Sequence, residues 1–285
     1  LGPVRPAAQT AAPLMRTIPS SGIELPAVGL GTWITFNVGN DPLLLDESVA
    51  VMAAFFEDGG LVIDSSPMYG SSQDTIGYGL EKLGHPPVFA ADKVWMPGGA
   101  EGRAQAEASR RKWGVERFDL MQVHNLVDWQ QHLDWLIERR EAGEVGHVGV
   151  TTSHGRRHDE LEEIMRSRRL DFVQLTYNIA DREAEARLLP LAEDRDIAVI
   201  ANRPFRRKAL IHRFEGTPLP GWAAEIGAGS WAQVLLKFIL SHPAITVAIP
   251  ATTRVDHVRE NLAAASGPLP DEAMRRRMVT TVQDL

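Results

Sequence analysis

Apolar runs of strand length alternate with amphipathic segments along most of the chain. The strand candidates occupy residues 27–33, 61–66, 88–95, 119–125, 147–152, 171–177, 197–205 and 245–251. Between them, apolar residues recur every three or four positions, as on one face of a helix. The clearest helix candidates are residues 45–56, 128–141, 161–169, 230–241 and 255–265. Such alternation favours parallel strands with right-handed crossovers. Eight strand–helix units that close on themselves predict an α/β fold, the (β/α)₈ TIM barrel.

An open doubly wound sheet is the alternative fold for this alternation. That fold binds dinucleotides with a glycine-rich loop after a strand. The stretch 29–33 (GLGTW) lacks the third glycine of such a loop, and 77–84 (GYGLEKLG) lies within a helical pattern. The barrel is therefore favoured. Residues 16–26 form two short runs around a Ser-Ser-Gly turn, which predicts an N-terminal hairpin capping the barrel.

The chain divides into an arm and one domain. Residues 1–15 are rich in Ala and Pro without periodicity, and they predict a mobile arm. Residues 16–285 are expected to form a single barrel domain. The stretch 206–229 is predicted as a long loop, and such loops often cover active sites. The short loop at 125–127 and the short, charged tail after residue 265 predict an open site.

Composition narrows the classes of partner. The chain has 285 residues, with 30 Lys and Arg against 37 Asp and Glu, for a net charge of −7. This acidity argues against nucleic acid or an anionic membrane as partner, and no apolar run approaches the roughly 18 residues of a membrane helix. The chain has no cysteine, which excludes thiolate nucleophiles and Cys-ligated metals. His154 and His158 have a metal-like spacing without an acidic third ligand, so we expect no metal site.

Ionisable residues end three neighbouring strand candidates, where barrels place their catalytic groups. Asp64, Lys93 and His124 stand at these ends, and Tyr69 follows Asp64 in the next loop. An ammonium within about 4–6 Å lowers the pKa of a phenol, a carboxylate keeps that ammonium charged, and a histidine can bond the same substrate oxygen. The quartet suits proton donation to a carbonyl under reduction. The hydride must then come from a cofactor.

Seven stretches that include this quartet resemble one family. They are LPAVGLGTW, VIDSSPMYG, FAADKVW, LMQVHN, GVTTS, VQLTYN and IPATTRVDHVREN. Together they resemble an aldo-keto reductase over nearly all of residues 16–261. The resemblance implies an NAD(P)H-dependent oxidoreductase that reversibly reduces an aldehyde or ketone to an alcohol. It implies Tyr69 as general acid and base, Lys93 and Asp64 as the groups that tune it, and His124 as the group that orients the carbonyl.

The resemblance also implies a cofactor site. The residues expected to contact the cofactor are Gly31, Thr32, Trp33, Asp64, Thr151, Thr152, Gln174, Asn202, Arg203, Pro204, Phe205, Pro250, Ala251, Thr252, Thr253, His257 and Asn261. Thr152 stands where Asn is common, and residues 202–205 stand where many members have a stacking Tyr. Ala251 and His257 replace the Lys and Arg of many NADPH-preferring members, which leaves Thr252, Thr253, Arg254 and Arg259 as candidate phosphate ligands. We expect NADPH ahead of NADH.

Trp33, Met68 and Trp95 are expected to line the substrate pocket. The partner expected is a small-molecule carbonyl, and the protein is expected to be a monomer or weak oligomer. A cytoplasmic location is expected because reduced cofactor is regenerated there. An exported or periplasmic form with its signal peptide removed would explain the Ala/Pro-rich arm and the first residue not being Met. Two other functions stay open: a cofactor-binding regulatory or redox-sensing subunit with little turnover, and a metal-dependent barrel hydrolase, which the lack of clustered ligands disfavours.

Overall fold

The computed structural model describes residues 12–285; residues 1–11 of the expected arm lie outside this described part. Eight parallel strands form one sheet in the order β10-β9-β8-β7-β6-β5-β4-β3. Their bounds are β3 Leu30–Gly31, β4 Val62–Asp64, β5 Phe89–Val94, β6 Phe118–Val123, β7 Val145–Thr151, β8 Phe172–Thr176, β9 Ala198–Asn202 and β10 Ile245–Ala248. Parallel bridges from Val28 to Ala248 and from Gly31 to Ala251 join the first strand to the last. The predicted (β/α)₈ barrel is confirmed.

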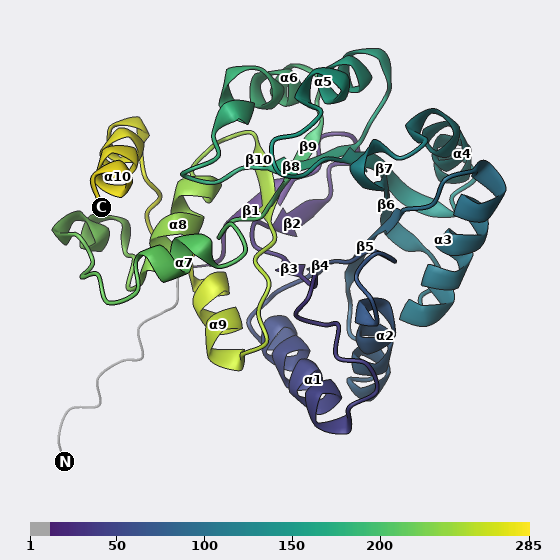
Figure 1. Cartoon of the computed structure of the whole chain (residues 1–285), viewed down its shortest axis with the longest axis horizontal. Coiled ribbons are helices and arrows are strands. Elements are labelled where there is room, and N and C mark those ends of the chain that lie inside the picture. The colour runs from purple at the N-terminus through teal and green to yellow at the C-terminus, as the bar shows by residue number, and fades with distance from the viewer. Residues whose placement is uncertain (1–11) are drawn as a thin grey trace.

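Helices surround the strands, as Figure 1 shows. Their bounds are α1 Pro42–Glu57, α2 Ser72–Lys82, α3 Gly99–Trp113, α4 Trp129–Glu141, α5 His158–Ser167, α6 Leu188–Asp194, α7 Ala209–Arg213, α8 Trp231–Leu240, α9 Val255–Ala263 and α10 Glu272–Asp284. Polar residues fix some of their starts: the Asp41 side chain accepts from the amides of Leu43 and Leu44, and Ser230 accepts from that of Gln233. These caps satisfy amides that have no partner inside the helix. The five helix candidates from the sequence are all helical.

The N-terminal hairpin closes one end of the barrel. Strands β1 (Met15–Thr17) and β2 (Glu24–Pro26) pair antiparallel. Ile18 and Leu25 of this hairpin are fully buried in the apolar cluster inside the barrel. The Ser21 hydroxyl lies 2.9 Å from Nε2 of His147, which is on β7. The predicted hairpin is confirmed, and it caps the barrel end opposite the carboxyl ends of the strands.

Alternate residues of each strand enter the barrel interior, because successive side chains of a strand point to opposite faces. On β5, Phe89 and Ala91 belong to the interior apolar cluster, and Lys93 is the next residue of that series. On β4, Val62 precedes Asp64 in the same way, and on β8 Phe172 precedes Gln174. The interior is therefore apolar near the hairpin and polar at the carboxyl ends of the strands.

Two parts of the chain differ from the sequence-based expectation. The expected loop at 206–229 contains helix α7 and a 3₁₀ turn, Gly221–Ile226. The charged tail forms α10, whose start is capped by Asp271 and whose Met278 and Val282 are buried. Figure 1 shows α10 at the outside of the barrel, near α8. The sequence did not reveal this helix, because Met278 and Val282 alone give a weak helical periodicity. The three consecutive arginines before Met278 obscure that pattern further.

None of the helices within residues 12–285 combines the length and the apolar composition needed to cross a membrane.

Candidate active site

A cavity of about 440 Å³ opens at the carboxyl ends of the strands. It brings together most of the residues that the sequence singled out: Gly31, Thr32, Trp33, Asp64, Met68, Tyr69, His124, Thr151, Thr152, Gln174, Asn202, Arg203, Pro204, Phe205, Ala251 and Thr253. Residues without an expected role also line it, namely Ile34, Thr35, Asn125, Ser153, His154 and Ile249. Arg207 and Lys208, whose positive charge the sequence places beside the expected cofactor site, line it as well. Arg207 and Lys208 belong to the basic run that follows β9, which was a readable signal for an anionic ligand.

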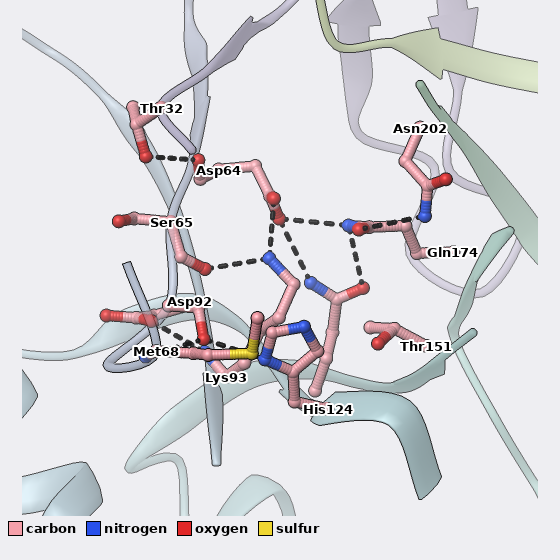
Figure 2. Close-up of polar contacts among 12 residues, drawn as sticks. Thr32, Asp64, Ser65, Met68, Asp92, Lys93, His124, Thr151, Gln174 and Asn202 are labelled. Carbon is pink, nitrogen blue, oxygen red and sulfur yellow. Dashed lines mark hydrogen bonds and ion pairs between the residues drawn. The ribbon is translucent and has the colours of Figure 1, made fainter. Parts of the chain in front are cut away.

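The deepest polar feature is an ion pair between Lys93 and Asp64. Lys93 Nζ lies 2.5 Å from Asp64 Oδ1, and their side chains are 0% and 2% exposed. Lys93 Nζ also donates to the carbonyl of Ser65 at 2.7 Å. The other carboxylate oxygen of Asp64 accepts from the amide of Gln174 at 3.0 Å (Figure 2). The same oxygen accepts from the amide of Gln122 at 3.3 Å. Burial acts to lower the pKa of Lys93. The negative charge of Asp64, with smaller contributions from Tyr69 and Asp92, raises this pKa by more, so the net shift is upward. Lys93 is therefore cationic at neutral pH.

Tyr69 lies against this ion pair. Lys93 Nζ is 5.3 Å from the centre of the Tyr69 ring. Burial raises the pKa of Tyr69, Lys93 acts to lower it, and the net shift is upward. Lys93 does lower the pKa of Tyr69, as expected, but the net shift is upward and that part of the expectation is wrong. The reason is that burial destabilises the phenolate more than the charge of Lys93 stabilises it. The phenol keeps its proton at neutral pH and is poised as a donor.

His124 lies next to Tyr69 in the lining of the cavity. The two rings meet edge to face, with centroids 5.7 Å apart. Burial first, and then the charge of Lys93, holds the pKa of His124 well below its usual value. Nδ1 of His124 lies 2.7 Å from the hydroxyl of Ser66, a residue that we did not assign to the site from the sequence. His124 therefore enters the cavity as a neutral imidazole.

An amide network lines the cavity beside the ion pair. Asn202 donates to the carbonyl of Thr152 at 2.9 Å and accepts from the hydroxyl of Thr176 at 2.7 Å. The Thr152 hydroxyl and Nε of Arg203 are buried and have no hydrogen-bond partner among the described residues. Both residues line the cavity. Because buried polar groups are nearly always satisfied, these atoms fit a ligand that carries polar groups, as a dinucleotide does.

The loop after β9 contributes to the cavity lining and contacts Trp33. The Arg207 guanidinium lies 4.3 Å from the centre of the Trp33 ring, and its Nη2 is 3.5 Å from Nε2 of His154. Arg206 pairs with Asp181 at 3.0 Å. His154 stands in the loop before α5, which begins at His158. The metal-like spacing of these two histidines therefore does not correspond to one helix face. In the described part of the chain, no group of three or more His, Asp or Glu side chains could hold a metal ion.

Several expected site residues do not line the cavity. They are Lys93, Trp95, Pro250, Thr252, His257 and Asn261. Lys93 is fully buried and contacts Asp64, which does line the cavity. The Trp95 side chain is 41% exposed and lies outside the cavity lining. Of the candidate phosphate ligands, Arg254 pairs with Asp256, while Arg259 pairs with Glu57 and Asp58 at the end of α1. These two arginines are already engaged by carboxylates.

Asp92 is a buried carboxyl just outside the barrel interior. Its side chain points the opposite way from that of Lys93 and accepts from Gln73 of α2 at 2.7 Å and from the Lys93 amide at 2.7 Å. Burial raises the pKa of Asp92 to about 7, more than these bonds and Lys93 lower it. The folded state thus binds this proton more tightly than the unfolded chain does. The resulting stabilisation is complete at low pH and is lost as pH rises through about 7.

We expect Asp92→Asn to flatten this dependence. Between pH 5 and pH 8, ionisation of Asp92 should lower the free energy of unfolding by about 2–3 kcal/mol, since one pKa unit corresponds to about 1.4 kcal/mol. The variant should lose that slope, because the asparagine side chain does not ionise. Gln73 can turn its amide, so that the hydrogen bonds to Gln73 and to the Lys93 backbone N–H are both kept. Urea unfolding at each pH measures the difference. Asp194→Asn, at an exposed carboxylate on α6, is the control and should keep the wild-type slope. An unchanged slope in Asp92→Asn would refute the assignment.

Comparison with known proteins points to one family. The model of the aldo/keto reductase family matches residues 27–277. The methylglyoxal reductase YeaE of Escherichia coli is 28% identical over 253 residues, covering 86% of this chain and 87% of that protein. The NADH-specific methylglyoxal reductase of the same organism is 25% identical over 264 residues, covering 79% and 78%. A solved thermostable aldo-keto reductase in complex with the inhibitor epalrestat has a TM-score of 0.79 at 26% identity, covering 94% of this chain and 99% of that one.

Proposed function

The chain belongs to the aldo/keto reductase family, and we propose that it reduces an aldehyde or ketone to an alcohol, reversibly, with a nicotinamide dinucleotide. The observation that carries the proposal is the buried pair of Lys93 and Asp64, with Nζ 5.3 Å from the centre of the Tyr69 ring, and Tyr69 and Asp64 both line the cavity. Burying a cation and a carboxylate is costly. Here the buried pair lies against the phenol of Tyr69, where the positive charge of Lys93 can stabilise a phenolate. We infer that this chemistry is the reason the pair is buried.

Each residue of the quartet has a role in this reaction. The reduced nicotinamide supplies a hydride to the carbonyl carbon when it is bound. Tyr69 donates its phenolic proton to the carbonyl oxygen, so that the alcohol leaves and a phenolate remains. Lys93, held by Asp64, stabilises the negative charge on Tyr69. His124 hydrogen-bonds the same oxygen and orients the carbonyl. In the reverse direction Tyr69 accepts the proton of the alcohol.

Polar groups beside the quartet fit the carboxamide and the phosphates of the cofactor. We propose that Thr152, Gln174 and Asn202 hold the carboxamide and that Arg203, Arg207 and Lys208 face the phosphates. The unpartnered Thr152 hydroxyl and Arg203 Nε support this assignment. The two methylglyoxal reductases among the relatives make methylglyoxal the first carbonyl to test.

We propose NADPH as the preferred cofactor, with NADH as the alternative. His257 is exposed on the first turn of α9, where a helix N-terminus favours anions. His257→Arg should lower the Kd for NADPH about fivefold relative to that for NADH, the size of one exposed charge pair. Quenching of Trp fluorescence measures both constants. His85→Arg, at an exposed loop position before β5, is the control. If the ratio of the two constants does not change, the adenosine phosphate is held by other residues.

Binding and turnover together test the proposed function. The purified protein is titrated with NADPH and with NADH, and each reduced cofactor is then mixed with methylglyoxal and with a panel of larger aldehydes and ketones. Saturable quenching with carbonyl-dependent oxidation of the cofactor is the expected result. Saturable quenching without oxidation of the cofactor by any carbonyl would favour a regulatory subunit. The lack of binding by either cofactor would refute the proposal.

A further inference from the structure

Ser66 is buried in the turn that connects β4 to Tyr69. Its side chain is 0% exposed. Its hydroxyl oxygen lies 2.7 Å from Nδ1 of His124 and accepts from the backbone N–H of Met68 at 3.2 Å. The carbonyl of the same residue accepts from the backbone N–H of Tyr69 at 3.0 Å. One turn thus holds Tyr69 by its backbone and touches His124 by its side chain.

The hydrogen-bond inventory of Ser66 decides the direction of the contact with His124. A serine hydroxyl has one proton and two lone pairs. If Nδ1 of His124 carried the ring proton, Ser66 would accept from both His124 and Met68, and its own proton would have no acceptor among the described residues. If Ser66 instead donates to Nδ1, the hydroxyl is fully satisfied. A buried donor without a partner is unfavourable, so the second arrangement is preferred.

The remaining ring nitrogen of His124 then carries the proton. Burial and Lys93 keep this imidazole neutral, so it holds a single proton on one of its two nitrogens. Nε2 has no hydrogen-bond partner among the described residues, and His124 lines the cavity. With Nδ1 occupied as an acceptor, the N–H of Nε2 is free to bond a ligand.

We propose that Ser66 is a positioning residue that fixes the proton of His124 on Nε2, so that the ring offers a hydrogen-bond donor to the carbonyl oxygen. The part that concerns the carbonyl rests on the proposed reductase function; the tautomer itself does not. In the other tautomer the cavity would present a nitrogen lone pair, which repels a carbonyl oxygen. Ser66 thereby contacts both groups that meet at that oxygen. Its carbonyl holds the backbone N–H of Tyr69, and its hydroxyl sets the position of the proton on His124.

Nitrogen NMR on the full chain reads the tautomer directly. The protein is labelled with ¹⁵N at histidine, and the His124 signals are identified by their loss in His124→Gln. In the wild type we expect Nε2 in the protonated range and Nδ1 in the unprotonated range. In Ser66→Ala we expect the two signals to move toward each other as the tautomers mix. Ser66→Thr keeps the hydroxyl and should restore the wild-type pattern.

Kinetics with NADPH and methylglyoxal supply the second readout. In Ser66→Ala we expect kcat/KM to fall about tenfold, less than the 10²–10³ that loss of an oxyanion donor costs, because the unlocked ring still presents Nε2–H part of the time. The Kd for NADPH should not change. Ser48→Ala is the matched control: Ser48 is a buried serine on α1 whose hydroxyl donates to the Leu44 carbonyl. It should leave both readouts unchanged.

The outcomes separate this proposal from the reductase function. A wild-type His124 protonated on Nδ1 overturns the proposal, and so does a Ser66→Ala variant with the wild-type spectrum. A wild type that binds NADPH but reduces no carbonyl refutes the reductase function; the spectra of the wild type and Ser66→Ala then decide the tautomer alone. If the spectrum of Ser66→Ala changes while kcat/KM with methylglyoxal stays at the wild-type value, the positioning role is overturned.

Discussion

Tyr69→Phe is expected to lower kcat by about 10²–10⁴-fold, the range that a general acid contributes. Phenylalanine fills the same space against Lys93 and His124 but has no proton to give to the carbonyl oxygen. The Kd for NADPH should stay within about twofold, because polar groups that we assign to the cofactor, such as Gln174 and Asn202, lie on β8 and β9, away from the Tyr69 turn. Single-turnover rates with methylglyoxal and fluorescence titrations measure the two quantities.

A second tyrosine provides the matched control for this change. Tyr78 lies on α2 with its hydroxyl 3.2 Å from Asp46, outside the cavity. Tyr78→Phe removes the same atom and should leave kcat unchanged. If Tyr69→Phe turned over at the wild-type rate, another group would have to supply the proton and the assigned role of Tyr69 would be wrong. A parallel loss of cofactor binding would instead indicate a structural role.

The fold could be predicted because each strand–helix unit carries its own periodicity. Strands buried on both faces, such as β8 and β9, appear as mainly apolar runs, and their spacing fits one helix between each pair. Helix α10 could not be predicted, because two buried side chains on a helix covered with charges give almost no pattern. Its position depends instead on Arg275, which donates to the Phe238 carbonyl and to the hydroxyl of Tyr177. Such contacts connect residues about 40 and 100 positions apart along the chain and leave no local signal.

Site residues could be predicted from the sequence where their position along a strand determines which way the side chain points. Asp64 and Lys93 end apolar runs, and the alternation of side chains sends both into the barrel. The net pKa shift of Tyr69 was not readable, because it depends on how deeply the phenol is buried. The contact of Ser66 with His124 was not readable either, since the two residues lie 58 positions apart and meet only when β4 and β6 are both in the barrel.

Lys93→Met should lower the free energy of unfolding by about 3–5 kcal/mol, as expected when one partner of a buried ion pair is removed. Methionine fills much of the same volume, so the loss comes mainly from the unpaired Asp64 carboxylate rather than from a cavity. Turnover should also fall steeply, because no cation remains to stabilise the phenolate of Tyr69. Urea unfolding and kcat measure the two effects.

A double-mutant comparison separates charge from packing. In Lys93→Met combined with Asp64→Asn the buried charge is gone, so we expect much of the stability to return while turnover stays low. Lys112→Met is the control: Lys112 pairs with Asp74 at 2.8 Å, but the two side chains are 41% and 53% exposed. Exposed pairs are worth less than about 1 kcal/mol, so this variant should unfold nearly as the wild type does. If Lys93→Met were as stable as Lys112→Met, solvent would have to reach Asp64. A return of stability without turnover would mean that the ion pair serves the chemistry of Tyr69, since an uncharged pair would then hold the barrel equally well.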